Sequence, residues 1–181
     1  GLVVKDTGSY WSPIGQAIIL VLIQTGGLGV VTVAASVSLF SGKKISLMQR
    51  STMQDAISAP KVGGIVRLTR FILKGTFLIE AAGALLLMPV FLSDYGLKGI
   101  WLSVFHSVSA FCNAGFDILG TAVHAFPSLT GYYGSILINM VIMLLIIMGG
   151  IGFLTWDDIY TNKLNFKRYR MQSKIILMTT T

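Results

Sequence analysis

A short segment within an apolar region has the residue types to place backbone oxygens around a cation. Cys112–Gly115 follows an apolar stretch and ends in glycine. Glycine adopts left-handed backbone angles readily, whereas a residue with a Cβ pays roughly 1–2 kcal/mol there. A turn of this kind can direct carbonyl oxygens to one side, where they replace the water around a cation. The alternative is an ordinary short helix and glycine turn with no ion, and the residues alone favour neither.

The stretch around this turn is too short to cross a membrane. Within residues 99–116, the helical part Trp101–Ala110 would be about 15 Å long at 1.5 Å per residue, which is half of a hydrocarbon core. Ser103, His106 and Ser107 also make it a poor lipid-facing helix. We therefore expect a half-helix that enters the membrane and returns, surrounded by protein or a water-filled cavity. Its C-terminal end, with partial negative charge, would favour a cation.

Glu80 is a carboxylate in the middle of an apolar run. Charged side chains are expensive inside a membrane and mark functional sites by default. Glu80 is therefore a candidate for a functional intramembrane carboxylate. The alternative is a protonated or hydrogen-bonded residue packed against a neighbouring helix, and we favour this structural interpretation.

The remaining polar residues do not form a recognisable catalytic or metal site. Asp157-Asp158 resembles the start of a magnesium–diphosphate motif, but Thr161 stands where a third acid is needed. We expect this pair to be a solvated helix end. His106 and His124 have no partners at zinc-ligand spacing and are expected to be structural.

Composition indicates that the lipid bilayer is the solvent of this chain. Of its 181 residues, 54% are hydrophobic and 12% are charged, whereas an average soluble domain has about 25% charged residues. Three runs are long enough to span a bilayer, a fourth begins at Ile175, and Ser12-Pro13 is a suitable start for the first helix. The three runs are Ile14–Phe40, Phe71–Leu92 and Tyr133–Trp156. The sequence predicts an all-α membrane protein.

The basic residues predict the orientation of these spans. Of the 14 lysines and arginines, 12 lie in Ser41–Lys74 or Asp157–Lys174. Short loops rich in lysine and arginine remain in the cytoplasm, so the net charge of +7 indicates topology before it indicates nucleic acid. We predict a multi-pass protein of the cell membrane. Loops 41–70 and 157–174 would be cytoplasmic, and residues 1–13 and 93–132 extracellular.

A repeated glycine motif predicts a modular architecture. Gly-Gly-x-Gly-x-x-Thr occurs at residues 26–32 and again at 149–155. It follows no strand, so small residues that allow close helix contact are a better interpretation than a phosphate-binding loop. We expect repeated units of helix, half-helix and helix, in a piece of a longer protein. The expected parts are the end of one unit (1–40), a loop (41–70), a complete unit (71–156, with helices at 71–92 and 133–156) and the start of a third (157–181).

Three segments carry a family resemblance. Residues 109–117 (SAFCNAGFD), the opening Gly1-Leu2-Val3-Val4 and residues 148–158 (MGGIGFLTWDD) resemble the Trk/Ktr/HKT superfamily of potassium transporters, in its bacterial TrkH/KtrB branch. The resemblance covers essentially the whole chain and implies four such units around one ion pore. It implies that the K⁺ selectivity filter includes Gly1, Cys112, Asn113, Ala114 and Gly115. Gly115 should then have left-handed backbone angles, and Gly120→Ser should affect K⁺ binding and selectivity much less than Gly115→Ser.

The resemblance also implies a function and partners. It implies potassium uptake by the ion-translocating subunit of a Trk/Ktr-type system, with K⁺ as the transported ion, no covalent cofactor, no other metal and no enzymatic activity. The coupling ion, Na⁺ or H⁺ if there is one, is left open. A homodimer, a cytoplasmic nucleotide-binding regulatory ring and membrane lipid are implied as partners, and nucleic acid is not.

Two other functions stay open at the level of the residues. A secondary carrier for a small organic substrate would bind it at the 99–116 break, and would show longer broken helices in inverted repeats. A membrane enzyme would use Asp157-Asp158 and would need a second acidic cluster on another cytoplasmic loop. A channel-type pore requires further copies of the helix–half-helix unit.

The charge asymmetry gives a topology that can be measured. Cysteines introduced at Lys44 and Arg168 should react with an impermeant thiol reagent only from the cytoplasm. Cysteines introduced at Gly96 and Ser128 should react only from outside. Labelling of positions 44 and 128 from the same side would contradict the predicted orientation.

Overall fold

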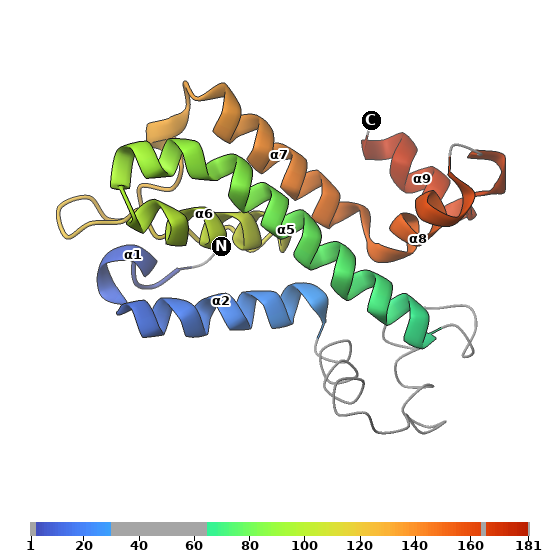
Figure 1. Ribbon diagram of the computed structural model, residues 1–181, viewed down its shortest axis with the longest axis horizontal. Coiled ribbons are helices and arrows are strands. Elements are labelled where there is room, and N and C mark those ends of the chain that lie inside the picture. The colour runs from blue at the N-terminus through green and yellow to red at the C-terminus, as the bar shows by residue number, and fades with distance from the viewer. Residues whose placement is uncertain (1–2, 30–64, 164–165, 181) are drawn as a thin grey trace. The chain divides into compact units, whose positions relative to one another are not determined.

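The computed structural model describes residues 3–29, 65–163 and 166–180. Every regular element in these residues is helical (Figure 1). In chain order they are α1 Thr7–Tyr10, α2 Pro13–Leu28, α5 Ile65–Tyr95, α6 Lys98–Phe111, η2 Thr130–Tyr132, α7 Ile136–Ile151, α8 Phe153–Asn162, η3 Phe166–Arg168 and α9 Met171–Thr180. The expected filter residue Gly1, and most of the 41–70 loop, lie outside the described residues.

These helices belong to two compact units. The first comprises Gly1–Gly27 and Phe77–Gly150, and it holds α1, α2, α6, α7 and most of α5. The second comprises Leu28–Thr76 and Ile151–Thr181, and it holds the beginning of α5 together with α8 and α9.

Helix α5 has the length and composition of a membrane span. Its segment Thr69–Tyr95 is the one described helix that passes this test alone, and α7 with α8 gives a second span if the two are counted together. α5 extends beyond the expected 71–92 at both ends. α2 is apolar but shorter, and the expected continuation of its run to Phe40 lies outside the described part of the chain.

The start of α2 confirms the predicted helix signal. The helix begins at Pro13, and the Ser12 hydroxyl oxygen accepts a hydrogen bond from the amide of Gly15 at 3.3 Å. This is the arrangement that Ser-Pro favours, because proline lacks the amide proton that the first turn cannot satisfy.

The third glycine of each repeated motif follows the end of a helix. Gly29 comes directly after α2 with φ of 81°, and Gly152 separates α7 from α8 with φ of 86°. These angles are disfavoured for residues with a Cβ, so each glycine allows the chain to leave the helix. The single helix expected over 133–156 is therefore divided at Gly152.

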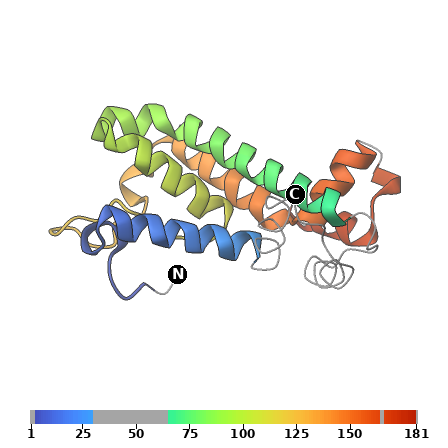
Figure 2. The same cartoon turned by 60° about the horizontal axis from the view of Figure 1, so that its bottom comes forward.

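The first unit buries small polar side chains beside its apolar core, and it exposes many large apolar side chains. Ser103 and Ser107 of α6 are fully buried, whereas Leu78 of α5 is 72% exposed and Ile136 of α7 is 80% exposed. α6 is enclosed by α2, α5 and α7 (Figures 1 and 2). Its 14 residues make it about 21 Å long, still shorter than a hydrocarbon core. Buried polar side chains on a short helix, with apolar side chains exposed on its neighbours, suit a helix surrounded by protein inside a membrane.

Asp6 joins the N-terminal segment to the loop before α7. Its carboxylate accepts hydrogen bonds from the Ser9 amide at 2.7 Å, the Ser9 hydroxyl at 2.6 Å and the Phe126 amide at 2.9 Å. A Cβ at Gly120 would overlap this carboxylate, and a Cβ at Gly8 would lie 2.7 Å from the Gly120 amide. A side chain at Gly120 would therefore disturb the packing of this loop against Asp6, which makes Gly120→Ser a poor control for Gly115→Ser.

Stability should depend on pH through Asp6. Burial raises the pKa of Asp6, but hydrogen bonds from Ser9, Phe126 and Gly8 together outweigh it and leave the pKa below its ordinary value. The stabilisation is therefore complete above the unfolded-state pKa and is lost as the pH falls through the folded-state pKa. Asp6→Ala should lower the free energy of unfolding by about 1–2 kcal/mol at neutral pH, and by less near about pH 3.

Thermal unfolding of the full-length protein in detergent would measure this difference. Asp6→Asn is the matched control, because it keeps one acceptor oxygen but cannot ionise. An Asp6→Ala effect of equal size at both pH values would contradict the role of the ionised carboxylate.

Candidate functional site

The turn after α6 closes the helix and reverses the chain. The amide of Asn113 donates to the Ala110 carbonyl at 3.0 Å, and the amide of Ala114 donates to the Ser109 carbonyl at 2.9 Å. Asn113 has φ of 53°, so these bonds form a Schellman-type helix end with asparagine in the left-handed position. The turn is held to the last residues of α6 by its own backbone amides.

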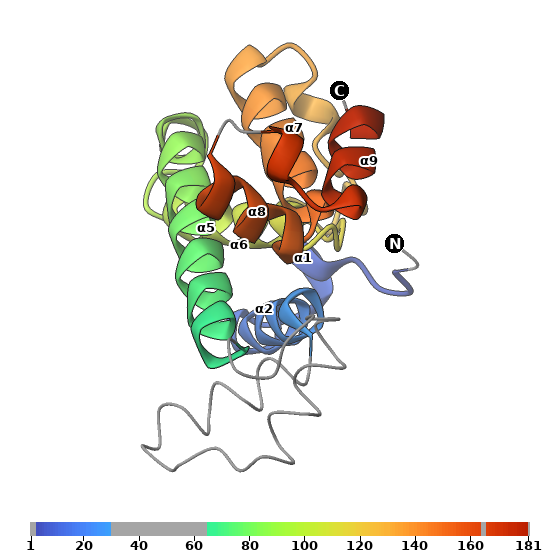
Figure 3. The ribbon, with the colours of Figure 1, turned by 90° about the vertical axis from the view of Figure 1, so that its right-hand side faces the viewer.

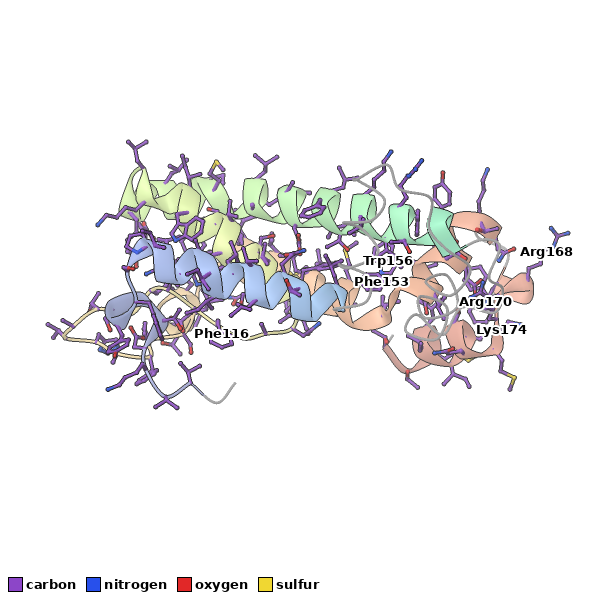
Figure 4. The ribbon with its side chains drawn as sticks, turned by 90° about the horizontal axis from the view of Figure 1, so that it is seen from below. Phe116, Phe153, Trp156, Arg168, Arg170 and Lys174 are labelled. Atoms are coloured by element: carbon purple, nitrogen blue, oxygen red, sulfur yellow. The ribbon has the colours of Figure 1, made fainter. Side chains whose placement is uncertain are left out.

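The far side of the turn is held by a buried serine. The Ser109 hydroxyl accepts from the Phe116 amide at 2.9 Å and donates to the Phe116 carbonyl at 2.7 Å (Phe116 is labelled in Figure 4). Between these fixed ends, Gly115 has the expected left-handed conformation, with φ of 70°. Cys112–Gly115 is therefore anchored on both sides.

The carbonyl oxygens of this turn have no hydrogen-bond donor in the part of the chain that the structure describes. None of the described residues donates a hydrogen bond to the carbonyl oxygen of Cys112, Asn113, Ala114 or Gly115. Asn113 and Gly115 are exposed, while the helix that precedes them is buried. The turn can thus offer backbone oxygens to a cation at the partially negative end of α6.

Glycines of both repeated motifs lie against the turn. A Cβ at Gly27 of α2 would overlap the sulfur of Cys112, and a Cβ at Gly149 of α7 would overlap the carbonyl oxygen of Phe111. The Asn113 side-chain amide also donates to the Ile146 carbonyl of α7 at 3.3 Å. The small residues allow α2 and α7 to approach the end of α6 from different sides.

Glu80 lies beside the same turn and is hydrogen-bonded. It is 5% exposed, and one carboxylate oxygen accepts from the Gln24 side-chain amide at 3.0 Å. The Cys112 thiol donates to the other oxygen across a longer 3.9 Å contact. This arrangement corresponds to the structural interpretation of Glu80, and it also connects the residue to the candidate site.

A cavity of about 310 Å³ adjoins the turn on the side of α7. Its lining includes His106, Asn113, Gly115, Asp117 and Ile142. His106 is buried with its Nδ1 2.7 Å from the Leu102 carbonyl oxygen, and its Nε2 has no hydrogen-bond partner among the described residues.

In the second unit, the paired aspartates connect α8 to α9, which pack side by side (Figure 3). Asp158 is 4% exposed, and it accepts from the Ser173 hydroxyl at 2.6 Å and the Arg170 amide at 3.0 Å. The Arg170 guanidinium lies 3.4 Å from Asp157 and 3.5 Å from Asp158 (Arg170 is labelled in Figure 4). The expectation of a solvated helix end is wrong for Asp158, because its carboxylate holds the start of α9.

Comparison with known families decides the identity of this arrangement. The profile of the family described as TrkH, cation transport protein, matches residues 2–179. The chain belongs to the TrkH family. A family of cation transport proteins implies a membrane protein, which agrees with the one or two candidate spans among the described helices.

Named relatives in the TrkH family align with nearly the whole chain. The potassium/sodium uptake protein NtpJ of Enterococcus hirae and the Ktr system potassium uptake protein B of Bacillus subtilis are each 38% identical over 181 residues. The Ktr system potassium uptake protein B of Vibrio alginolyticus is 29% identical over 182 residues. Each alignment covers 99% of this chain and 39% of the relative.

Some residues at the TrkH-family turn were not expected from sequence. Ser109 and Gln24 looked like isolated polar residues in apolar runs, and their roles depend on contacts that form only in the fold. The repeated motif did predict close helix contact, but not that Gly27 and Gly149 both contact the end of α6. The one signal available was the occurrence of glycine and polar residues within otherwise apolar runs.

The contact of Gly149 with α6 can be tested by a matched pair of substitutions. Gly149→Ala should lower the free energy of unfolding by about 1–3 kcal/mol, because the new methyl group overlaps the Phe111 carbonyl oxygen. Gly150→Ala is the control, since the nearest atom to its Cβ is the Asn113 side-chain nitrogen at 4.0 Å. Alanine favours helix, so the control should be neutral or stabilised by up to about 1 kcal/mol. Thermal unfolding in detergent that gives equal losses for both would contradict this packing.

Proposed function

We propose that this chain forms part of the ion pathway of a potassium uptake protein, with Cys112–Gly115 as one segment of its K⁺ selectivity filter. The observation that carries the proposal is a turn anchored at both ends whose four carbonyl oxygens accept no hydrogen bond from the described residues. The names of the relatives, two of them potassium uptake proteins of Ktr systems, support the choice of K⁺.

The chemistry follows from the cost of dehydrating K⁺. An ion that leaves water needs oxygen ligands in place of its hydration shell, and backbone carbonyls provide them without a net charge that would bind it too tightly. The anchoring bonds at Ser109 and Asn113 keep the oxygens from turning inward toward backbone amides. The C-terminal end of α6 adds a partial negative charge at the same place.

The wider architecture belongs to the same proposal. The chain spans 39% of the length of its relatives, and we propose that the complete protein repeats the helix–half-helix–helix unit around the pore. Residues 1–40 would end one unit, with Gly1 in its filter. Residues 41–70 would form a loop, 71–156 a second unit, and 157–181 the start of a third.

We propose a multi-pass protein of the cell membrane with loops 41–70 and 157–174 in the cytoplasm and residues 1–13 and 93–132 outside. The complete protein would be a homodimer that binds a cytoplasmic nucleotide-binding ring. It would act without covalent cofactor or enzymatic chemistry. The name of the Enterococcus hirae relative includes sodium, which supports Na⁺ ahead of H⁺ as a second ion.

Gly115→Ser in the full-length protein tests the filter assignment. With φ of 70°, a side chain at Gly115 costs about 1–2 kcal/mol, which corresponds to roughly five- to thirty-fold weaker K⁺ binding. Preference for K⁺ over Na⁺ should fall as well, because the set of carbonyl ligands is deformed. The measurement is K⁺ and Na⁺ uptake in cells that lack other potassium systems.

Gly131→Ser is the appropriate control, in place of Gly120. A Cβ at Gly131 meets no atom within 4 Å, whereas a Cβ at Gly120 overlaps Asp6. Gly131→Ser should leave K⁺ affinity and selectivity unchanged. If Gly115→Ser also leaves both unchanged, the filter assignment is wrong, and a carrier with its substrate site elsewhere becomes the better account.

A further inference from the structure

We propose that Glu80 is a positioning residue for the filter turn, whose carboxylate holds Cys112 in place against α2 and thereby helps to set the preference for K⁺ over Na⁺. This inference rests on the proposed function of the Cys112–Gly115 turn. Glu80 does not contact the ion in this proposal and acts on the filter only through Cys112.

The two oxygens of the carboxylate have different partners. Oε2 accepts from the Gln24 side-chain amide of α2 at 3.0 Å, and Oε1 faces the Cys112 thiol at 3.9 Å. A residue of α5 therefore joins α2, which precedes it by more than fifty positions, to the first residue of the turn. No other described side chain makes such a connection between the turn and another helix through a carboxylate.

The backbone beneath the carboxylate is fixed by α6. The Ser107 hydroxyl donates to the Glu80 carbonyl at 2.7 Å, and Ser107 is fully buried. A Cβ at Gly83 would lie 2.5 Å from the Ser107 hydroxyl oxygen and 2.8 Å from the Leu145 side chain. α5 and α6 thus approach closely one turn beyond Glu80. These contacts fix the position of Glu80 along α6.

The surroundings of Glu80 make its hydrogen bonds hard to replace. It borders a cavity of about 370 Å³ whose other lining residues, Gln24 apart, are apolar. Those residues are Leu20, Val21, Phe77, Ala81, Ala84, Val104 and Val108. No lysine or arginine among the described residues forms an ion pair with Glu80. In such apolar surroundings a lost hydrogen bond leaves an unsatisfied polar group, which costs more than the bond itself contributes.

Cys112 also lies against Gly27 of α2. A Cβ at Gly27 would overlap the Cys112 sulfur, so no larger residue of α2 fits there in the present arrangement. The cysteine side chain therefore contacts both Gly27 and the Glu80 carboxylate. A change at Glu80 would allow the sulfur to move, and the backbone of the first filter residue would move with it.

The test is Glu80→Gln in the full-length protein, with K⁺ uptake measured against K⁺ concentration and against competing Na⁺. Glutamine has nearly the same shape but presents one oxygen instead of two. We expect the KM for K⁺ to rise about three- to tenfold, with reduced preference over Na⁺ and unchanged amounts of protein in the membrane. Unchanged KM and unchanged selectivity would overturn the proposal.

Two further variants separate positioning from general structural damage. Leu87→Ala on the same helix removes a fully buried apolar side chain. Leucine has no polar atom, so the variant leaves the hydrogen bonds of Glu80 in place. It should reduce the amount of protein or the maximal rate and leave KM and selectivity unchanged. Cys112→Ala removes the donor toward Glu80 and should lose selectivity to the extent that Glu80→Gln does. Cys112→Ser keeps a donor and should lose less selectivity than Cys112→Ala.

Combining Cys112→Ala with Glu80→Gln gives the decisive comparison. If Glu80 acts through Cys112, the double variant Cys112→Ala/Glu80→Gln should be no more impaired in selectivity than either single variant. Effects that multiply would overturn the coupling. If Glu80→Gln yields no protein, the test is the comparison of selectivity between Cys112→Ala and Cys112→Ser. Equal selectivity for those two variants would overturn the proposal.

The outcomes also distinguish this inference from the proposed function. If Gly115→Ser changes K⁺ affinity and Glu80→Gln does not, the filter assignment stands and the positioning role is wrong. If both leave affinity and selectivity unchanged, the filter assignment itself fails.

Discussion

The first unit depends on a turn whose carbonyl oxygens accept no hydrogen bond from the described residues. A polypeptide normally pairs its buried backbone amides and carbonyls with each other. Here the nearby backbone amides already donate to other acceptors, so the carbonyl oxygens of Cys112–Gly115 stay unpaired among the described residues. The Asn113 and Ala114 amides bond to α6, and the Phe116 amide bonds to Ser109. The left-handed angles of Asn113 and Gly115 then allow the chain to turn without bringing a donor to these oxygens.

Such a turn must also be held in position by other helices, and in a membrane the hydrophobic effect does not supply that force. Close packing replaces it. Gly27 and Gly149 allow α2 and α7 to approach the end of α6, and Gly83 allows α5 to approach its middle. Two hydrogen bonds also fix how these helices are oriented. Gln24 of α2 donates to the Glu80 side chain, and Ser107 of α6 donates to the Glu80 backbone. Many large apolar side chains of α5 and α7, such as Leu78 and Ile136, are exposed on this unit.

The second unit shows a different use of charge. Asp158 is buried and bonded to the start of α9, and the Arg170 guanidinium lies near both aspartates. An aspartate that accepts the amide at a helix start stabilises that start, because the first amides of a helix have no partner within it. The paired aspartates that resembled a metal motif are therefore explained by the α8–α9 connection.

The sequence by itself determined the class of the protein and the local features of the site. Apolar composition indicated a membrane protein, Ser12-Pro13 indicated where α2 begins, and the short polar-containing run before Gly115 predicted a half-helix followed by a turn. These features depend on neighbouring residues only, so their physical causes are visible in the chain. Only the tertiary structure decided that Gln24 pairs with Glu80, that Gly120 is packed against Asp6 and that Asp158 is buried. Each of these depends on a residue brought close from a distant or separately folded segment, and a single sequence carries no direct signal of which distant residue will be the partner.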